Sequence, residues 1–377
     1  MKTLGIVQER LWHYRVPFYE ALRRRLREEG IEVVLVHGQP SRHEEGRDDS
    51  GHLGWAIEIK NRSWCMGESE FLWQPCLSHV SDCDLLVVQQ ENRMLVNYWL
   101  LFRKKFMKQK LAFWGHGKNC QASNPNGLKE RWKRLFLKSP DWWFAYTDFS
   151  KDILLRAGFP ADRITVVENA IDTTESIRIF DEITEEEINE LRRQYYITKE
   201  MPVGIFCSRL YREKRIDFLL QCVAQVKERV SDFHFFVIGS GPDSSIVEEY
   251  ARNHGNWFHY VGPKYSREKV KFFKLAQFQL MPGPVGLHIV DSFALLTPII
   301  TTDIDCHGPE IIYLENGING IMSENKIDAY VGEIVRFIED KTYQERLVKG
   351  CMQARKQYTI ENMAENFARG VVAAMEK

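Results

Sequence analysis

The segment PGPVGLHIVDSF, residues 282–293, joins a turn rich in glycine and proline to an apolar run that carries one histidine and one aspartate. The turn residues predict a loop, and the apolar run predicts a helix that begins near Leu287. The first amides of a helix have no partner within it, so those of Gly286, Leu287 and His288 are candidates for binding a phosphate. Asp291, one turn further on, is a candidate acceptor for the hydroxyls of a ribose. Alternatively, Asp291 complements the helix dipole and His288 caps or packs the helix.

Two cations follow another strand-like segment, VGIFCSR (203–209). Arg209 ends this segment, and Lys214 lies in the sequence YREKR that comes next. Two fixed cations can neutralise the oxygens of a diphosphate and stabilise charge that develops on it as a leaving group. Arg209 and Lys214 are therefore candidates for binding and for catalysis, with ordinary surface charge as the alternative.

Glycines mark a third strand end. The segment FFVIGSGP (235–242) closes with Gly239 and Gly241 and leads into a helical pattern. Glycine at such a position lets a ligand approach the backbone closely. A single pair of glycines is weak evidence when taken alone.

Two more strand ends add candidate residues. WFHYVGPKY (257–265) places Gly262 and Lys264 in a loop suited to edge a base-binding pocket. CHGPEIIYLENGINGIM (306–322) brings Glu310 to the strand end that follows.

The first half of the chain contributes two polar candidates. His116 stands between two glycines after a strand-like segment, where it either contacts a substrate or only fixes a turn. Asn169 ends the segment ITVVEN (164–169), where a hinge or turn role is as reasonable as ligand contact.

Strands rich in valine, isoleucine and phenylalanine alternate with amphipathic helical stretches along the whole chain. This pattern predicts the α/β class, with two Rossmann-like, doubly wound parallel-sheet domains that face each other across a cleft. The predicted strands are 3–7, 32–38, 84–90, 111–116, 142–147 and 164–169, then 203–209, 233–239, 258–262, 278–283 and 298–303. The acidic stretch at 181–192 has no strand character and separates the two series. The expected divisions are a first domain at 1–172, a linker region at 173–200, a second domain at 201–345 and C-terminal helices at 346–377.

Composition limits the class of protein. The chain has 377 residues, 44% of them hydrophobic, and a formal net charge of −1, which argues against a general nucleic-acid binder. No apolar run approaches the roughly 18–20 residues of a membrane-spanning helix. The eight cysteines include no CxxC pair, which predicts reduced thiols. We therefore expect a cytoplasmic protein.

The stretch from Tyr98 to Lys138 is unusually basic. It holds eleven lysines and arginines but a single acid, Glu130, with aromatic residues interleaved. A solvated helical face is one interpretation. The other is a surface that docks on an anionic membrane or a polyanionic acceptor, which would place the protein on the inner face of the cytoplasmic membrane. Nucleic acid is not an expected partner, because no recognised binding module accompanies the stretch.

The order of these features resembles the retaining family 4 (group 1) glycosyltransferases of the GT-B superfamily. The resemblance rests on the sequence of Arg and Lys, GxGP, an aromatic with glycine, the glycine turn with its acid, and GPEI with NGxNG. Three segments of the first half agree: YRVPFYEAL (14–22), FWGHG (113–117) and the stretch 147–172. It covers nearly the whole chain.

The resemblance implies transfer of a sugar from a nucleotide-diphosphate sugar to a hydroxyl of a saccharide or lipid-linked acceptor, in the synthesis of a surface polysaccharide or glycolipid. The second domain would hold the donor and the first would hold the acceptor. The last helix, about 360–376, would cross back onto the first domain. No organic cofactor is implied, and a metal is not expected to be required. The implied donor contacts are Arg209 and Lys214 to the diphosphate, Gly239 and Gly241 to the nucleotide and Asp291 to the ribose, with His116 facing the sugar.

One departure from the family concerns this same turn. The family usually has two glutamates eight positions apart, where this sequence has Gly283 and Asp291. Aspartate keeps the carboxylate with a shorter reach, whereas glycine removes a side chain that approaches the donor sugar. Two other functions stay open: a nucleotide-sugar epimerase, which shares the two-domain architecture, and a catalytically silent protein that binds nucleotide sugars, which Gly283 suggests.

Overall fold

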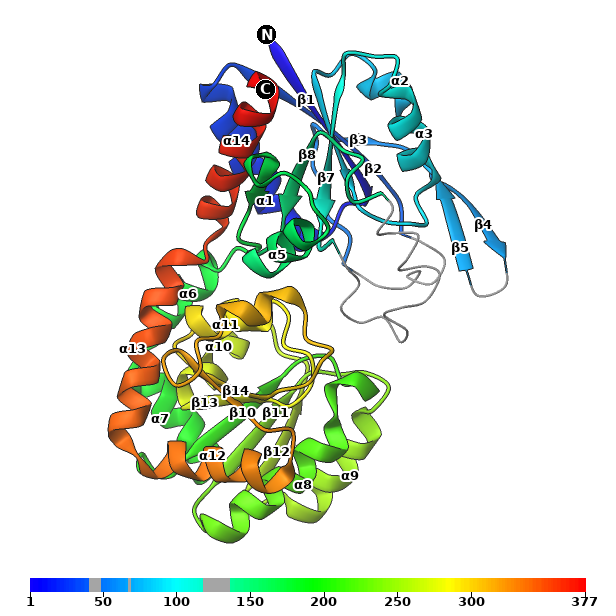
Figure 1. Ribbon diagram of the computed structural model, residues 1–377. Coiled ribbons are helices and arrows are strands. Elements are labelled where there is room, and N and C mark those ends of the chain that lie inside the picture. The colour runs from blue at the N-terminus through cyan, green and yellow to red at the C-terminus, as the bar shows by residue number, and fades with distance from the viewer. Residues whose placement is uncertain (41–48, 67–68, 118–135) are drawn as a thin grey trace. The chain divides into compact units, whose positions relative to one another are not determined.

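The computed structural model describes residues 1–40, 49–66, 69–117 and 136–377. They form two compact units (Figure 1). Unit 1 comprises Met1–Asp172 together with Tyr358–Lys377, and unit 2 comprises Thr173–Gln357. Each unit is built around its own parallel sheet.

The sheet of unit 1 has seven strands in the order β3-β2-β1-β6-β7-β8-β9, and every neighbouring pair is parallel. Helices cover both faces, as the hydrophobic strand sequences predict. The strands of this sheet are β1 (Lys2–Arg10), β2 (Ile31–Gly38), β3 (Ile57–Glu58), β6 (Leu85–Gln89), β7 (Lys110–Gly115), β8 (Trp142–Ala145) and β9 (Ile164–Val166). The helices are η1 (His13–Arg15), α1 (Val16–Glu28), α2 (Leu77–Val80), α3 (Leu95–Arg103), α5 (Asp148–Arg156), η3 (Ala161–Arg163) and α14 (Ile360–Glu376).

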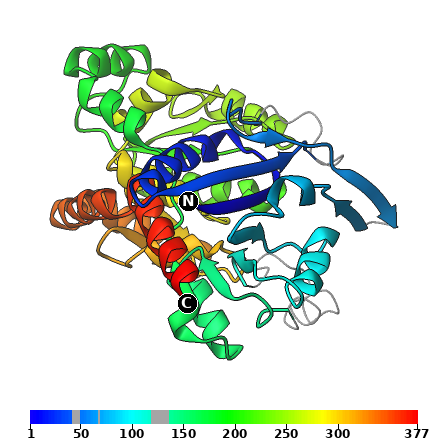
Figure 2. The same ribbon diagram turned by 90° about the horizontal axis from the view of Figure 1, so that it is seen from above.

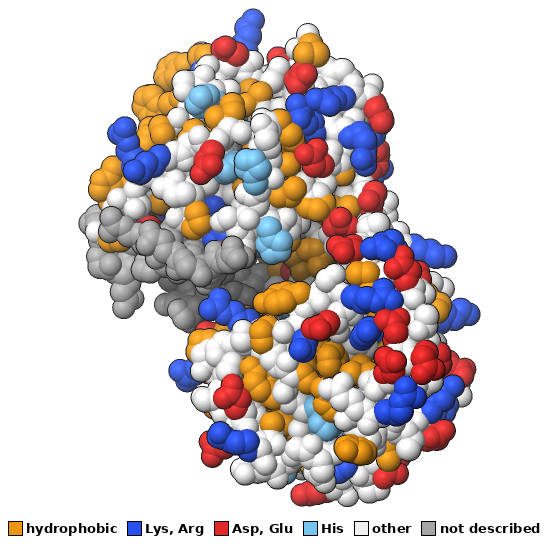
Figure 3. Space-filling model, turned by 180° about the vertical axis from the view of Figure 1, so that it is seen from behind, with side chains coloured by type: hydrophobic (Ala, Val, Ile, Leu, Met, Phe, Trp, Pro, Cys, Tyr) orange, Lys and Arg blue, Asp and Glu red, His pale blue; other side chains and the backbone are white. Residues whose placement is uncertain are grey.

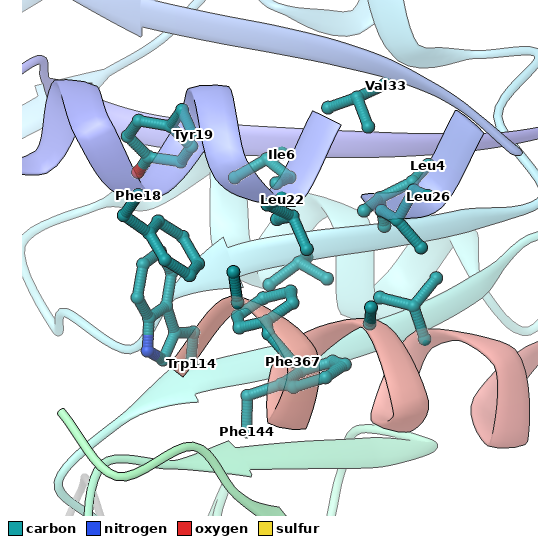
Figure 4. Close-up of a cluster of buried hydrophobic side chains, with 14 of the residues drawn as sticks. Leu4, Ile6, Phe18, Tyr19, Leu22, Leu26, Val33, Trp114, Phe144 and Phe367 are labelled. Carbon is teal, nitrogen blue, oxygen red and sulfur yellow. The ribbon is translucent and has the colours of Figure 1, made fainter. Parts of the chain in front are cut away.

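Alternation along β1 sends neighbouring residues to opposite cores: Ile6 packs beneath α1 and α14, whereas Val7 joins the core on the other face. Figure 4 shows the first core. There Phe367 of α14 stacks on Phe144 at 4.1 Å, and Phe18 of α1 contacts both Phe367 and Trp114. The helix α14 thus lies beside α1 within unit 1 (Figure 2), as expected for the last helix.

A two-stranded antiparallel hairpin projects from unit 1 (Figure 1). It consists of β4 (Arg62–Met66) and β5 (Ser69–Trp73), with Trp64 opposite Phe71. The sequence analysis did not predict this hairpin.

The sheet of unit 2 has six parallel strands in the order β12-β11-β10-β13-β14-β15. Its strands are β10 (Val203–Cys207), β11 (His234–Ile238), β12 (Phe258–Gly262), β13 (Phe278–Met281), β14 (Ile299–Thr302) and β15 (Gly320–Ser323). Its helices are α6 (Thr174–Glu182), α7 (Glu185–Gln194), η4 (Arg212–Lys214), α8 (Ile216–Arg229), α9 (Ser244–His254), α10 (Ser266–Leu275), α11 (His288–Ala294), η5 (Pro309–Tyr313), α12 (Ile327–Glu339) and α13 (Lys341–Gln357). The predicted class, α/β with two parallel sheets, is confirmed.

The region 173–200 is not the separate linker that the sequence suggested. It folds into α6 and α7, which pack on α10 as part of unit 2. Thr184 and Glu187 form a capping box that starts α7, and Glu187 also pairs with Arg267 (2.9 Å) and Lys271 (3.0 Å) of α10. Basic and acidic side chains are accordingly interspersed over unit 2 (Figure 3).

Two chain-wide features bear on function. Among the described residues, no helix combines the length and the apolar character that crossing a bilayer requires. The seven cysteines in that part of the chain form no disulfide with one another.

Candidate functional site

Strand order in unit 2 reverses direction between β10 and β13, because β11 and β12 lie to one side of β10 and β13–β15 to the other. The loops after these two strands diverge at such a switch point and leave a crevice at the carboxyl ends of the strands, where doubly wound sheets bind ligands. The loop after β10 holds Arg209 and Lys214, and the loop after β13 holds the Gly283–Asp291 segment. The fold therefore brings together the two clusters that the sequence singled out.

The two cations of the first loop have different surroundings. Arg209 is exposed and available to a ligand. Lys214 is only 4% exposed, and its ammonium donates a hydrogen bond to the carbonyl oxygen of Pro284 at 2.6 Å. Burial lowers the pKa of Lys214 to about 8. Lys214 thus ties the two loops together with at least one of its three protons.

Arg215 strengthens the same connection, and sequence reasoning missed it. Its backbone is left-handed, with φ of 58°, between η4 and α8. The guanidinium donates to the Pro282 carbonyl at 3.0 Å and to the Thr302 hydroxyl at 3.1 Å. These bonds hold the ends of β13 and β14 against the loop that carries the cations.

The turn after β13 opens α11, whose first residue is His288, one residue beyond the predicted start. The amide of His288 donates to the carbonyl of Val285 at 3.3 Å. The amides of Gly286 and Leu287 make no hydrogen bond to the described part of the chain. Two of the three predicted phosphate-binding amides therefore remain available.

The side chain of His288 lies across the switch point, with Nε2 3.2 Å from the Ser208 hydroxyl at the end of β10. Burial, with a further contribution from Lys214, lowers the pKa of His288 to about 3. The imidazole is therefore neutral near neutral pH. It fixes the start of α11 against β10 and adds no positive charge to the site.

Asp291 has a partner that the sequence did not indicate. Its Oδ2 lies 3.2 Å from Nζ of Lys269 on α10, and both side chains are mostly buried. The carboxylate raises the pKa of Lys269, so the ammonium keeps its positive charge near neutral pH. Because Lys269 occupies one carboxylate oxygen, Asp291 presents the other to a ligand.

His307 holds the glycine turn from behind. The amide of Val285 donates to its Nδ1 at 3.3 Å, so Nε2 carries the proton and donates to the Thr302 carbonyl at 2.7 Å. Glu310 is buried at the start of η5, close to Gly308, whose position borders Gly286. Glu310 thus lies near the glycine turn, through Gly308.

Gly283 has a packing role that explains the departure from the family pattern. A Cβ at this position would lie 2.5 Å from the carbonyl oxygen of Glu213 and 2.9 Å from Cα of Lys214. The backbone of η4 therefore occupies the space that the Cβ of a glutamate at position 283 would need. A glycine is required here as long as η4 keeps this place.

The glycines after β11 likewise serve packing between loops. A Cβ on Gly239 would overlap the carbonyl oxygen of Ser208, and one on Gly241 would overlap that of Leu210. The amide of Leu210 donates to the Ser240 carbonyl at 3.0 Å, which continues the pairing of β10 and β11 past their ends. The close approach predicted for a ligand is made here by the neighbouring loop.

The loop after β12 lies at the far side of the same sheet edge. Gly262 has a left-handed φ of 69°. Lys264 is partly exposed and pairs with Glu268 at 3.6 Å on the first turn of α10. Gly262 thus borders the end of β11, because the amide of Gly239, the residue after that strand, donates to the Gly262 carbonyl at 3.1 Å.

In unit 1, His116 follows β7 and Asn169 follows β9, at the carboxyl ends of two strands that β8 separates. The ring of His116 packs on Tyr146 with centroids 4.2 Å apart and is partly exposed. Asn169 is buried, and its Oδ1 accepts from Nη2 of Arg15 at 2.6 Å. Asn169 therefore anchors a buried arginine, whereas His116 is the better placed of the two to meet a ligand.

Much of the basic stretch 98–138 lies outside the described residues, namely 118–135. Its described part exposes three aromatic side chains on and after α3, Trp99, Phe102 and Phe106, together with Met107. We call this surface the aromatic ridge. The rings run in sequence, 5.8 Å from Trp99 to Phe102 and 5.2 Å from Phe102 to Phe106. Lys105 and Lys108 are exposed on the same segment.

No group of three or more histidine, cysteine, aspartate or glutamate side chains is placed to hold a metal ion within residues 1–40, 49–66, 69–117 and 136–377.

Comparison with known families agrees with this geometry. Residues 201–340 match the family described as "Glycosyl transferases group 1", and residues 18–175 match "Glycosyltransferase Family 4". The chain belongs to the group 1, family 4 glycosyltransferases. The two matches together take in the switch point of unit 2 and every strand of the two parallel sheets except β1.

Curated relatives are distant and overlap only in part. An "Alpha-monoglucosyldiacylglycerol synthase" from Acholeplasma laidlawii is 23% identical over 48% of this chain and 46% of its own length. An "Alpha-D-kanosaminyltransferase" from Streptomyces kanamyceticus is 20% identical over 54% of this chain and 53% of its own. The chain thus spans about half the length of the curated relatives it matches.

Solved structures match over the full length. A glycosyltransferase from Rickettsia africae has a TM-score of 0.69 at 16% identity, covering 99% of this chain and 98% of that one. HepE from Anabaena, in complex with UDP, has a TM-score of 0.68 at 15% identity, covering 99% and 100%. At this identity the likeness shows the fold, which is the GT-B architecture of two Rossmann-like domains.

Proposed function

We propose that the protein is a retaining glycosyltransferase that moves a sugar from a nucleotide-diphosphate sugar to a hydroxyl of a saccharide or lipid-linked acceptor, in the synthesis of a surface polysaccharide or glycolipid. One observation carries this proposal. The switch point of unit 2 presents an exposed arginine, two available amides and an aspartate paired with Lys269 at one sheet edge, in a chain of this family. Diphosphate and ribose are the groups that such an edge recognises.

The diphosphate becomes the leaving group. As the bond between its oxygen and the anomeric carbon breaks, negative charge develops on that oxygen. Arg209 contacts the diphosphate directly, and the amides of Gly286 and Leu287 donate to it. Lys214 lies behind the turn, where its positive charge adds to the field and its bond to Pro284 keeps the amides in place. These groups carry the charge stabilisation without a divalent cation, so we propose that activity survives chelation by EDTA.

Asp291 and Lys269 together read the ribose. The carboxylate oxygen that Lys269 leaves available accepts from one hydroxyl, and the ammonium can donate to its neighbour. The glycines after β11 and β12, with Lys264, edge the pocket for the base. The shorter reach of aspartate relative to the glutamate usual in the family is thereby offset by a second group.

Retention follows if the acceptor hydroxyl attacks on the face from which the diphosphate leaves. The new bond joins the acceptor oxygen to the anomeric carbon, the bond to the diphosphate breaks, and the hydroxyl proton passes to a phosphate oxygen. An α-linked product made from an α-linked nucleotide-sugar donor is the outcome of retention, and two relatives carry the prefix alpha in their names. We propose His116 as a substrate contact of unit 1.

The aromatic ridge supports docking on an anionic membrane that carries the acceptor. Phe106 is 72% exposed. Exposed aromatic side chains beside lysines are typical of protein surfaces that bind membranes rich in acidic lipids. We therefore propose an intracellular enzyme that associates peripherally with the membrane.

Incubation with a panel of UDP-, GDP- and ADP-sugars, followed by NMR, tests the proposal. Slow release of nucleoside diphosphate and free sugar is expected, and the sugar should first appear with the anomeric configuration that it had in the donor. Conversion of donor into its epimer would support an epimerase, binding without turnover would support a silent binding protein, and an inverted product would overturn retention.

A further inference from the structure

The structure points to a saccharide-binding groove on unit 1, beside the β4–β5 hairpin. This inference deepens the proposed function, on which it rests, because it assigns a subsite for a sugar unit of the acceptor. The groove has a volume of about 850 Å³, within the range of small-molecule sites. Its lining residues include Gln39, Lys60, Asn61, Arg62, Trp64 and Glu70.

The groove lies at the carboxyl edge of the unit 1 sheet. That sheet reverses its strand order between β1 and β6, and the groove residues follow β2 and β3 on the next positions of the same edge. Gln39 and Asn61 fix the groove wall by exchanging two bonds, from the Asn61 amide to Gln39 Oε1 at 2.8 Å and from Gln39 Nε2 to the Asn61 carbonyl at 3.1 Å. The wall is therefore built before any ligand arrives.

The polar groups of the groove floor are unbalanced. Asn61 donates its side-chain N–H to the Glu9 carbonyl at 2.9 Å, which leaves Oδ1 without a donor among the described residues. Glu70 has a side chain only 3% exposed, and neither of its carboxylate oxygens accepts a hydrogen bond from that part of the chain. Within the described residues its one ionic partner is Arg93 at 3.8 Å, and Arg93 lies much closer, 2.6 Å, to Glu9.

Buried acceptors without donors are unfavourable, by about 1–3 kcal/mol each, so the missing donors are to be expected from water or from a ligand. Hydroxyl groups, amide groups and cationic nitrogen groups are ligand chemistries that bring donors, and a hydroxyl group does so without adding charge. Lys60 and Arg62 are exposed at the rim, and their charge disfavours an ammonium ligand. A ligand with many hydroxyl groups fits the floor and the rim together.

Trp64 completes the recognition of a sugar. Its indole is 51% exposed on β4 and lines the groove, where it offers an apolar face. A pyranose ring can lay its C–H face on such an indole while its hydroxyls reach the acceptors of the floor. The pairing of an exposed aromatic ring with buried acceptors distinguishes a sugar from a simple anion.

The test uses the full chain and saturation-transfer NMR with an equimolar mixture of the methyl glycosides of glucose, galactose, mannose and N-acetylglucosamine. At least one glycoside should receive saturation from the wild-type protein. Trp64→Ala should reduce that transfer at least several-fold, and Glu70→Gln, which keeps the shape of the side chain, should also reduce it. Phe149→Ala removes an exposed aromatic ring elsewhere on unit 1 and should leave the transfer unchanged.

Transfer to none of the four glycosides, or equal transfer with wild type and Trp64→Ala, would overturn the assignment. Thermal unfolding of each variant checks that the fold is kept, and because Trp64 is exposed its replacement should not disturb the core. Donor hydrolysis by the wild-type protein separates the two proposals. If hydrolysis occurs but the groove variants change nothing, only the groove assignment fails; if no donor is turned over, the proposed function fails.

Discussion

The carboxyl edges of the two sheets differ in how their polar groups are satisfied. In unit 2, the loops at the switch point are bonded to one another through Lys214, Arg215, His288 and His307. In unit 1, the groove beside the hairpin leaves acceptors of Asn61 and Glu70 without donors in the described chain. The loops of unit 2 are thus held by bonds to one another, whereas the groove of unit 1 has buried acceptors that lack a donor among the described residues.

This difference matches what each edge has to recognise. A diphosphate and a ribose are constant groups, so a preorganised set of cations and amides serves every donor of one class. An acceptor varies between enzymes, and its hydroxyls can supply the donors that the protein lacks. Ligand binding by unit 2 should therefore be sensitive to changes in packing, whereas ligand binding by unit 1 should be sensitive to changes in polarity.

The largest effect is expected at Gly283, where the backbone of η4 leaves no space for a side chain. Gly283→Glu forces η4 away from the turn and should not restore the family pattern. Overpacking of about 1–3 kcal/mol corresponds to a loss of roughly 5- to 150-fold in donor affinity, measured by calorimetry.

Gly332→Ala is the matched control, because no atom lies within 4 Å of its added Cβ on α12. It should preserve donor affinity and slightly raise the melting temperature. A gain of donor affinity or activity in Gly283→Glu would contradict the packing role.

The next effect concerns the pair that reads the ribose. Lys269→Met removes the charge that faces Asp291 and should weaken binding of a nucleoside diphosphate by about tenfold, since a mostly buried carboxylate is left unpaired. Asp291→Asn should reduce the preference for the ribonucleotide over its 2′- and 3′-deoxy forms. The double variant should lose less than the sum of both losses; strict additivity would show that the two side chains act separately.

Acid should weaken unit 2 before the carboxylates titrate. Burial lowers the pKa of His259 to about 4 and that of His288 to about 3, from about 6.5 in the unfolded chain. The folded state then binds fewer protons than the unfolded state between those values, so stability falls as pH drops below about 6.5. The slope is at most about 1.4 kcal/mol per pH unit for each histidine.

Protection of unit 2 amides from hydrogen exchange at pH 7, 6 and 5 measures this loss of stability. The pKa of His234, which is hydrogen-bonded to His259 at 3.1 Å, is lowered by burial as well. His259→Gln should flatten the slope. A protection of unit 2 that does not change with pH in this range would contradict the expectation.

A separate effect, on membrane binding in place of nucleotide binding, is expected at the aromatic ridge of unit 1. Lys105→Glu together with Lys108→Glu should reduce co-sedimentation with phosphatidylglycerol vesicles. The free energy of membrane binding should weaken by about 1 kcal/mol or more for each lysine. Lys104 is left intact because it pairs with Asp141 at 2.7 Å. Lys341→Glu with Lys349→Glu on α13 is the control, and equal loss in both pairs would show a general charge effect in place of a docking surface.

The sequence predicted the strands well because their apolar runs are long and continuous. It also predicted that the segments of Arg209 and Asp291 meet, since the carboxyl ends of parallel strands share one edge. It misread the acidic stretch 181–192 as part of a linker, although Thr184 and Glu187 have the spacing of a capping box. It assigned the close approach at Gly239 to a ligand, whereas the neighbouring loop makes it.

Other features depend on tertiary contacts that leave no local pattern. Lys269 lies on a helix with several other lysines, and only the fold selects it to face Asp291. The β4–β5 hairpin joins strands of mixed polarity, RSWCM and SEFLW, which show no clear alternation. The groove it borders was therefore not detectable from the sequence.

Calorimetric titration of nucleoside diphosphates and monophosphates into the wild-type protein and Arg209→Ala tests the donor site most directly. If Arg209 binds the second phosphate, UDP, GDP or ADP should bind the wild type at least about tenfold more tightly than its monophosphate, a difference of about 1.4 kcal/mol. That difference should largely disappear in Arg209→Ala, while the monophosphate keeps its affinity. An undiminished preference for the diphosphate in the variant, or no binding of any nucleotide to the wild type, would contradict the assignment.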